Sequence, residues 1–341
     1  MGGAAMIPVL LVTGFLGSGK TTLIRRILAD PAFARSAVIV NEWGEIGLDH
    51  ELIGSADESL LELTTGCLCC RVASDLGRTF SDLAARGAGK YDRVLIETSG
   101  LADPAPILRA LLSDPAIRPG HALAGTLTLV DARAGEASLA RHPEARRQVA
   151  FADRLLVTKT DLVALGEGLS ALLAALNPGA PVLAAAHGAV AHGAVAPEIL
   201  FDTSPLPAPL ADQLAPDHPA PDPQPALHSG GVESFVLVRE RPVPGLALVL
   251  LLQALAEHCG GRLLRVKGLV DVAERPGRPA LIHGVQHIFE PPQFLPAWPG
   301  PDRRTRLVFI AEGVPRHFPA RLLAALEEEV AEEQAPASEA A

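Results

Sequence analysis

Residues 14–21 read GFLGSGKT, which has the spacing G-x-x-x-x-G-K-[ST] of a phosphate-binding loop. Glycines let backbone N–H groups approach phosphate oxygens closely, and the positive end of a following helix also attracts the anion. In such a loop Lys20 would reach the β- and γ-phosphates of a nucleotide, and the Thr21 hydroxyl would contact Mg²⁺. The alternative is an ordinary glycine-rich turn. The apolar run VLLVT before the loop and the helical TTLIRRIL after it favour the nucleotide.

A second element that a nucleotide hydrolase needs lies at residues 93–100, RVLIETSG. It is an apolar strand that ends in an acid, as a Walker-B element does. The acid here is Glu97 rather than Asp, and Gly100 follows where a backbone N–H could meet a γ-phosphate. A lone acid after an apolar strand is common and usually faces solvent, so this pattern indicates a function only together with the phosphate loop.

Residues 158–161, TKTD, resemble the guanine-reading element N-K-x-D and follow the apolar run RLLV. The Asp161 carboxylate can accept hydrogen bonds from N1–H and the 2-amino group of guanine, whereas adenine offers no such pair of donors. Lys159 would lie against the purine face. Thr158 replaces the usual Asn, so the amide that contacts the base and braces the phosphate loop is lost, although a hydroxyl can still donate one hydrogen bond. A helix-initiating turn would explain the Asp but not the Lys.

Three of the four cysteines, Cys67, Cys69 and Cys70, cluster in TTGCLCCR at residues 64–71, too close together to form a disulfide framework. Thiolates are soft ligands that suit Zn²⁺, Co²⁺, Ni²⁺ and Cu⁺. Cys67 and Cys69 point to the same side of an extended chain, and Cys70 can join them if the chain turns into a helix there, as the spacing of residues 72–87 predicts. The cluster favours an open metal site completed by an oxygen or nitrogen ligand. Buried small side chains and a redox switch are the alternatives.

Between the phosphate loop and the cysteines lies NEWGEIGLD, residues 41–49, directly after the apolar run AVIV. It holds the acids Glu42, Glu45 and Asp49 where a nucleotide-responsive loop would sit. These acids could serve Mg²⁺, the attacking water or a second metal, and the sequence does not distinguish among these roles.

The elements that must position these motifs alternate short β-like runs with helical patterns over residues 7–200. This alternation predicts an α/β fold with a mostly parallel sheet flanked by helices. A Pro-rich stretch follows, and then a strand, a helix and further strands indicate a small α+β domain. We expect a phosphate-loop domain over residues 1–202, a linker over 203–230, an α+β domain over 231–326 and an acidic tail over 327–341.

The charge balance excludes two classes of partner. The chain carries 29 Lys+Arg against 39 Asp+Glu, a net charge of −10, and has no basic block. Clustered Lys and Arg supply the affinity for nucleic acids and anionic membranes, so neither is expected to bind. The first apolar run is too short to span a bilayer and lacks the flanks of a signal peptide. We therefore expect a cytoplasmic protein whose thiols stay reduced.

The order of GFLGSGKTTL, NEWGEIGLD, GCLCC, ETSGLADP and TKTD resembles that of the CobW-like family of phosphate-loop GTPases, although the second element is usually N-E-F-G-E. Residues 232–310, with RVKG and HGVQHIF, resemble the family's C-terminal domain. The resemblance implies a GTPase that uses GTP and Mg²⁺ and binds a transition metal, Zn²⁺ or Co²⁺. It would deliver this metal to a client metalloprotein or a cofactor-biosynthesis protein. A second copy of the chain, in a nucleotide-dependent homodimer, is another partner that fits.

The same resemblance assigns roles to residues of this chain. Lys20, Thr21, Glu97 and Gly100 would be catalytic, Thr158, Lys159 and Asp161 would read guanine, and Cys67, Cys69 and Cys70 would bind the cargo metal with Glu42 as an oxygen ligand. The remaining nucleotide-binding residues would be Gly14, Gly17, Ser18, Gly19 and Thr22.

Two other functions stay open at this point. The thiols could act as a nucleotide-dependent zinc or redox sensor, and the phosphate loop could belong to a small-molecule kinase. His283 and His287 lie four positions apart, hence on one face if the run is a strand, and a polar sheet face is the ordinary explanation.

Overall fold

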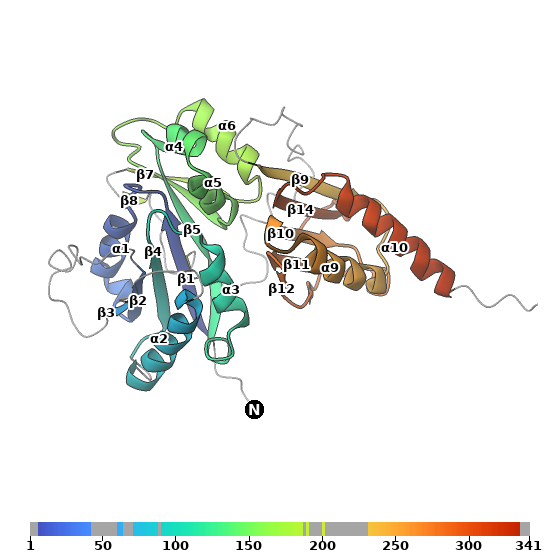
Figure 1. The fold of residues 1–341 in the computed structure, drawn as a ribbon, viewed down its shortest axis with the longest axis horizontal. Helices are drawn as coiled ribbons and strands as arrows, with labels where there is room; N and C mark the ends of the chain where they lie inside the picture. The colour runs from blue at the N-terminus through green and yellow to red at the C-terminus, as the bar shows by residue number, and fades with distance from the viewer. Residues whose placement is uncertain are drawn as a thin grey trace, which may run out of the picture. The chain divides into compact units, whose positions relative to one another are not determined.

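The computed structural model describes residues 6–41, 60–63, 71–87, 90–186, 189–190, 200–201 and 231–334 (Figure 1). The chain divides into two compact units, Met1–Ser204 and Pro205–Ala341. Each unit builds its own β-sheet and its own hydrophobic core.

The N-terminal unit is organised around a sheet with the strand order β3-β2-β4-β1-β5-β6-β7-β8. Neighbouring strands run parallel from β3 to β7, and the short β8 pairs antiparallel with β7. The phosphate loop follows β1, which lies between β4 and β5, so the loop is flanked by the carboxyl ends of two further strands. The strands are β1 Ile7–Gly14, β2 Ser36–Asn41, β3 Leu60–Leu63, β4 Arg93–Thr98, β5 His121–Asp131, β6 Arg154–Thr158, β7 Val182–Ala186 and β8 Ala189–Val190.

Helices stand on both sides of this sheet (Figure 1). α1 packs Leu23, Ile24 and Ile27 into the same core as Leu10 and Val12 of β1. The intervening side chains of β1, Val9 and Leu11, are also fully buried, which requires a second covered face. The helical segments are α1 Lys20–Ala29, η1 Pro31–Phe33, α2 Arg71–Gly87, α3 Ala105–Ser113, α4 Gly135–Arg141, α5 Pro143–Ala150 and α6 Glu167–Leu176.

The predicted α/β architecture is confirmed, because long apolar runs identify strands that are buried on both faces. The helix expected after the cysteine cluster is present as α2. Other elements went unpredicted. β3, α4 and α5 have only 4, 7 and 8 residues, which leaves little periodicity to detect, and α6, with 10 residues, was also missed.

The C-terminal unit contains an antiparallel sheet with the order β12-β11-β10-β14-β9, and β13 also pairs with β11. Two helices, α9 and α10, contribute to one core with the sheet, in which Leu251 and Leu255 meet Val266, Ile282 and Phe309. The predicted α+β class is therefore confirmed. Its elements are β9 Val232–Arg239, α9 Gly245–Cys259, η3 Gly260–Arg262, β10 Leu263–Val270, β11 Ala280–Val285, β12 Ile288–Phe289, β13 Gln293–Phe294, β14 Thr305–Glu312 and α10 Phe318–Gln334.

The apolar helix α9 spans 15 residues and buries Leu248, Leu251, Leu252 and Leu255 in this core. Within the described part of the chain, every helix is too short or too polar to traverse a bilayer.

α10 continues past position 326 to Gln334, because Val330 is buried in the core and extends the helix packing. One feature of this unit differs from the expectations. The run HGVQHIF is not one strand: β11 ends at Val285, and a turn with Gln286 in the left-handed region (φ 53°) separates it from β12. His283 and His287 therefore do not share a strand face. His283 instead forms a hydrogen bond through Nδ1 with Glu290 Oε2 at 2.9 Å.

Candidate nucleotide site

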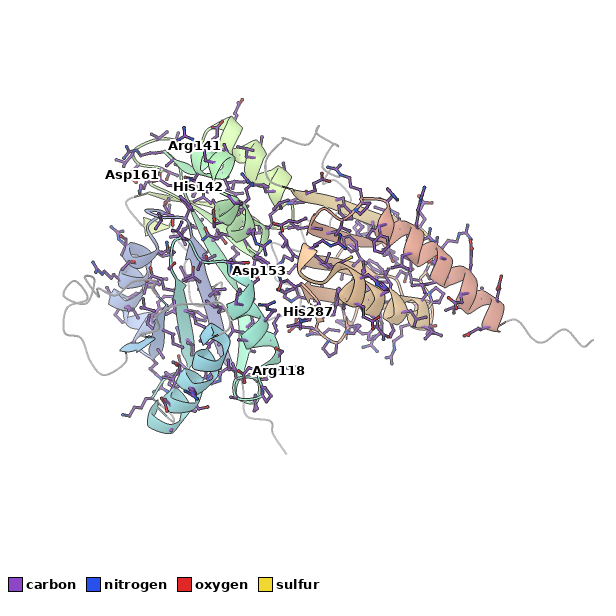
Figure 2. The ribbon with its side chains drawn as sticks, in the orientation of Figure 1. Arg118, Arg141, His142, Asp153, Asp161 and His287 are labelled. Carbon is purple, nitrogen blue, oxygen red and sulfur yellow. The ribbon has the colours of Figure 1, made fainter. Side chains whose placement is uncertain are left out.

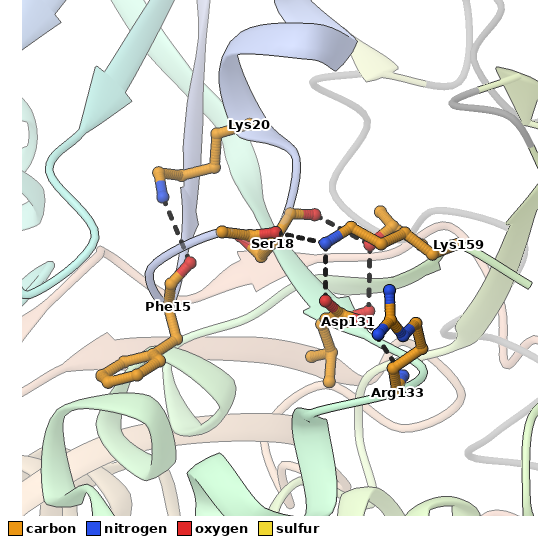
Figure 3. Close-up of polar contacts among 9 residues, drawn as sticks. Phe15, Ser18, Lys20, Asp131, Arg133 and Lys159 are labelled. Atoms are coloured by element: carbon orange, nitrogen blue, oxygen red, sulfur yellow. Dashed lines mark hydrogen bonds and ion pairs between the residues drawn. The ribbon is translucent and has the colours of Figure 1, made fainter. Parts of the chain in front are cut away.

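The phosphate loop connects β1 to α1 and encloses the ammonium group of Lys20. Lys20 Nζ donates hydrogen bonds to the carbonyl oxygens of Gly14 at 2.8 Å and Phe15 at 3.3 Å (Figure 3). The side chain is only 8% exposed. The lysine predicted to meet the phosphates is therefore held inside the loop that would surround them.

Three positions of the phosphate loop require glycine, for steric or conformational reasons. A Cβ atom on Gly14 would lie 2.4 Å from the carbonyl oxygen of Leu129 in β5, so a side chain does not fit there. Gly17 and Gly19 have φ values of 72° and 96°. Gly19 also precedes α1 without a side-chain cap, which leaves the first N–H groups of the helix available to an anion. Ser18 is buried within the loop, and Thr22 is exposed at the start of α1.

Thr21, in the first turn of α1, contacts Glu97, near the end of β4. Thr21 Oγ1 donates a hydrogen bond to Glu97 Oε1 at 2.7 Å, and the Glu97 side chain is buried. The parallel pairing of β1 with β4 sets Val12 beside Glu97 and brings the phosphate loop to this acid. A hydroxyl and a carboxylate are hard oxygen donors of the kind that Mg²⁺ prefers, so the pair fits that ion.

Gly100 lies against the phosphate loop. A Cβ atom built on it would stand 2.9 Å from the Leu16 backbone nitrogen and 2.6 Å from Leu16 Cδ2. Gln148 of α5 supports the loop after β4, to which Gly100 belongs. Its Nε2 donates to the carbonyl oxygens of Gly100 and Ala102, both at 3.1 Å. One residue earlier, Arg147 forms an ion pair with Asp103 at 3.0 Å. The loop after β4 is thus fixed between the phosphate loop and α5.

The TKTD segment also contacts the phosphate loop. Thr158 Oγ1 donates to the Ser18 carbonyl oxygen at 2.8 Å, and Lys159 Nζ donates to the Gly17 carbonyl oxygen at 2.8 Å. The single donor that a threonine retains in place of asparagine is used to brace the loop.

Asp161 lies in a turn in which the backbone N–H groups of Leu162 and Val163 donate to the Lys159 carbonyl oxygen. Figure 2 places Asp161 and His142 at one end of the parallel sheet and Arg118 at the other. Asp161 follows β6 and Arg118 precedes β5, so the exposed Asp161 lies at the carboxyl end of the strands, on the side of the phosphate loop.

Comparison with known proteins accounts for both units. Residues 8–184 match the family described as CobW/HypB/UreG, nucleotide-binding domain, and residues 232–328 match the cobalamin synthesis protein cobW C-terminal domain. The chain belongs to the CobW/HypB/UreG family. The resemblance seen in the motifs is thereby confirmed.

Relatives within this family resemble the chain over most or part of its length. The zinc chaperone YjiA of Escherichia coli is 33% identical over 317 residues, which cover 91% of this chain and 95% of the relative. The zinc chaperone CobW of Pseudomonas aeruginosa is 45% identical over 150 residues, covering 41% of this chain and 40% of its own. The solved structure of Zn(II)-bound YjiA GTPase from E. coli superimposes with a TM-score of 0.70 at 26% identity, covering 95% of this chain and 99% of the other.

Family motifs account for part of the site, and other side chains complete it. Asp131, at the end of β5, and Gln148, inside α5, were not singled out by the sequence. Asp131 could have been found, because it ends an apolar strand of a parallel sheet, where ligands of such folds bind. Gln148 carries no such signal, since an amide in a short helix is ordinary.

The predicted metal ligands Glu42, Cys67, Cys69 and Cys70 lie outside the described residues, and their roles remain predictions. Among the residues that the structure does describe, no group of three or more His, Cys, Asp and Glu side chains could hold a metal. The remaining cysteine, Cys259, is buried in the C-terminal core, and this burial raises the pKa of its thiol.

Proposed function

We propose that the chain is a GTP-hydrolysing metallochaperone that binds a transition metal at Cys67, Cys69 and Cys70 and delivers it to a client protein or a cofactor pathway. Family membership supports this function, since relatives carry the names zinc chaperone and zinc-regulated GTPase metalloprotein activator. The proposed reaction converts GTP and water to GDP and phosphate.

One observation carries the guanine nucleotide assignment. The phosphate loop is contacted by the predicted base-reading segment, through Thr158 on Ser18 and Lys159 on Gly17. A bound nucleotide would extend from the Lys20 ammonium toward Lys159 and Asp161. The Asp161 carboxylate would then accept from guanine N1–H and the 2-amino group.

Hydrolysis would rest on positioning and charge stabilisation, as phosphoryl transfer generally does. Lys20 would neutralise charge on the β- and γ-phosphates, and the backbone N–H of Gly100 would meet the γ-phosphate. Thr21 and Glu97, which already share a hydrogen bond, would hold Mg²⁺. When bound, this ion would offset negative charge on the transferred phosphate.

The proposed cargo is Zn²⁺ or Co²⁺, because thiolates are soft ligands for both. Zn²⁺ gains support from the names of the relatives. Glu42 would complete the site as an oxygen ligand, which leaves it open enough for the metal to be passed on.

We further propose that nucleotide and cargo are coupled. In the sequence the cysteines lie between two candidate switch segments, residues 41–49 and 97–104. If GTP and Mg²⁺ order these segments, nucleotide and metal must change each other's affinity by the same factor. A nucleotide-dependent homodimer would be one state in which the metal is presented to a client.

The experiment is a titration of the protein with Zn²⁺ and with Co²⁺, each with and without a non-hydrolysable GTP analogue. We expect the analogue to change the metal affinity at least fivefold, as coupling between sites typically does, and Cys69→Ser to abolish the tight site. Cys259→Ser is the matched control, because it removes a thiol that is buried in the other unit. Equal affinities with and without nucleotide would contradict delivery driven by GTP. A loss of nucleotide turnover on peroxide treatment that requires Cys69 would support the sensor instead.

A further inference from the structure

Asp131 occupies the last position of β5, where its side chain is 14% exposed and its carboxylate accepts two hydrogen bonds. Oδ2 accepts from Lys159 Nζ at 2.6 Å, and Oδ1 accepts from the backbone N–H of Arg133 at 2.8 Å (Figure 3). The parallel pairing of β5 with β6 sets Asp131 beside Thr158. The strand register therefore places this acid next to the start of the TKTD segment.

Lys159 has an unusual backbone, since its φ of 59° lies in the left-handed region that few residues with side chains adopt. Its ammonium group has two anchors, the Gly17 carbonyl oxygen at 2.8 Å and the Asp131 carboxylate. A lysine side chain has four rotatable bonds, and two anchors at its tip confine the whole stem. The stem is the part that would lie against a purine face.

The electrostatics of Asp131 agree with this arrangement. Burial raises the pKa of its carboxyl group, but the hydrogen bond and charge of Lys159, together with backbone N–H donors, outweigh burial and lower the pKa overall. The carboxylate is therefore ionised at neutral pH. Its hydrogen bond with the lysine is charge-assisted, a class that is shorter and stronger than neutral hydrogen bonds.

We propose that Asp131 is a positioning residue for purine binding, which fixes Lys159 as the platform on which the base lies. The inference rests on the proposed function, because it requires a purine nucleotide in this site. Without Asp131, the Gly17 carbonyl oxygen remains as an anchor, and the lysine stem samples other rotamers. Because a platform contacts any purine face, the loss of affinity is the same for GTP, GDP and ITP.

The test is a double-mutant cycle on GDP affinity with Asp131→Asn and Lys159→Met. Asn keeps an oxygen for the Arg133 N–H and removes the charge, so the turn is preserved. We expect Asp131→Asn to weaken GDP binding about tenfold, in keeping with loss of a charge-assisted hydrogen bond, and to raise KM for GTP much more than it lowers kcat. In the Lys159→Met background the same substitution changes nothing further, because the acid acts through the lysine.

Asp92→Asn is the matched control, since Asp92 also pairs with a cation, Arg35 at 3.1 Å, but precedes β4 at the opposite end of the sheet. Asp131→Ser provides a second variant with an oxygen at this position. Unchanged GDP affinity in both Asp131 variants, or an equal loss with and without Lys159, would overturn the proposal. Failure of the guanine assignment would be recognised separately, as equal binding of GTP and ATP by the unmodified protein.

Discussion

The hydroxyl of Thr158 donates a hydrogen bond to the carbonyl oxygen of Ser18 at 2.8 Å, across 140 residues of sequence. This bond joins the end of β6 to the phosphate loop after β1. Since Lys159 makes a second such bond to Gly17, the base-reading segment and the phosphate loop form one hydrogen-bonded unit. Binding of the base and binding of the phosphates are therefore expected to depend on each other.

Removing the Thr158 hydroxyl tests this dependence. Thr158→Val keeps the shape of the buried side chain and leaves the Ser18 carbonyl oxygen without this donor. We expect GDP affinity to fall about tenfold, which corresponds to about 1.4 kcal/mol and to one buried hydrogen bond. Thr158→Asn restores an amide and is expected to bind GDP at least as tightly as the unmodified protein. Isothermal titration of the two variants measures both effects, and wild-type affinity in Thr158→Val would refute the bracing role.

Asp161→Asn tests the reading of guanine. The carboxylate accepts two hydrogen bonds from guanine, whereas an amide offers a donor that suits the 2-oxo group of xanthine. We expect GTP affinity to fall roughly a hundredfold, because hydrogen bonds to charged groups are each worth about 1.5–3 kcal/mol, and XTP affinity to rise. Competition against a fluorescent nucleotide measures the switch. Asp161 is exposed, so folding is not expected to change, and equal losses for GTP and XTP would argue against base recognition.

Gln148→Leu separates hydrolysis from binding. The amide of Gln148 holds the carbonyl oxygens of Gly100 and Ala102, which belong to the loop that would meet the γ-phosphate. Leucine fills the same space without donors, so the loop loses its fixed position. We expect kcat for GTP to fall about tenfold, less than the roughly hundredfold that a misplacement of about 1 Å can cost, with less than a twofold change in GDP affinity.

A matched control for Gln148 is Asn177→Leu. Asn177 is a second buried amide, and its Nδ2 donates to the carbonyl oxygens of Val149, next to Gln148 in α5, and of Ala152, just beyond the helix. Its loss is expected to lower thermal stability without a specific effect on kcat. Equal losses of kcat in the two variants would mean that Gln148 acts only through the stability of α5.

The sequence was sufficient for the architecture and for the contiguous motifs. Strands such as β1 and β5 are recognisable because most of their side chains are apolar, and Lys20 and Thr21 are recognisable because the loop demands a fixed local order. Short elements such as β3 are not recognisable in this way, since 4 residues carry too little pattern.

What the sequence could not supply are contacts between side chains and distant backbone. Gln148 acts on carbonyl oxygens and Asp131 on a lysine that only the folded chain brings near. For Thr158 the motif suggests a donor to the phosphate loop, but only the fold identifies the Ser18 carbonyl oxygen as its acceptor. The carbonyl oxygen that accepts such a bond can belong to any residue type, so no residue pattern marks it. Such contacts follow from the strand register, which is a property of the sheet rather than of a motif.

His121 predicts how the stability of the N-terminal unit responds to pH. The residue is 6% exposed, and its ring lies 4.6 Å from the Phe80 ring and forms hydrogen bonds with Tyr91 and the Ile117 carbonyl oxygen. Burial lowers the pKa of His121 below 6.5, and the hydrogen bond to Ile117 offsets only part of this shift. The unfolded chain therefore binds the proton more readily than the folded one. The free energy of unfolding should decrease as the pH falls below about 6.5, by up to about 1.4 kcal/mol per pH unit from this group.

The test compares urea unfolding of the unmodified protein and His121→Gln at pH 7.5 and pH 5. Glutamine cannot take up the proton, so the variant is expected to lose less stability between the two pH values, even if it is less stable at pH 7.5. Tryptophan fluorescence does not report on the unfolding of the N-terminal unit alone. The signal should therefore come from hydrogen exchange of amides in β5, which begins at His121. If the two proteins lose equal free energy between the two pH values, the buried imidazole is not the group that makes the unit acid-sensitive.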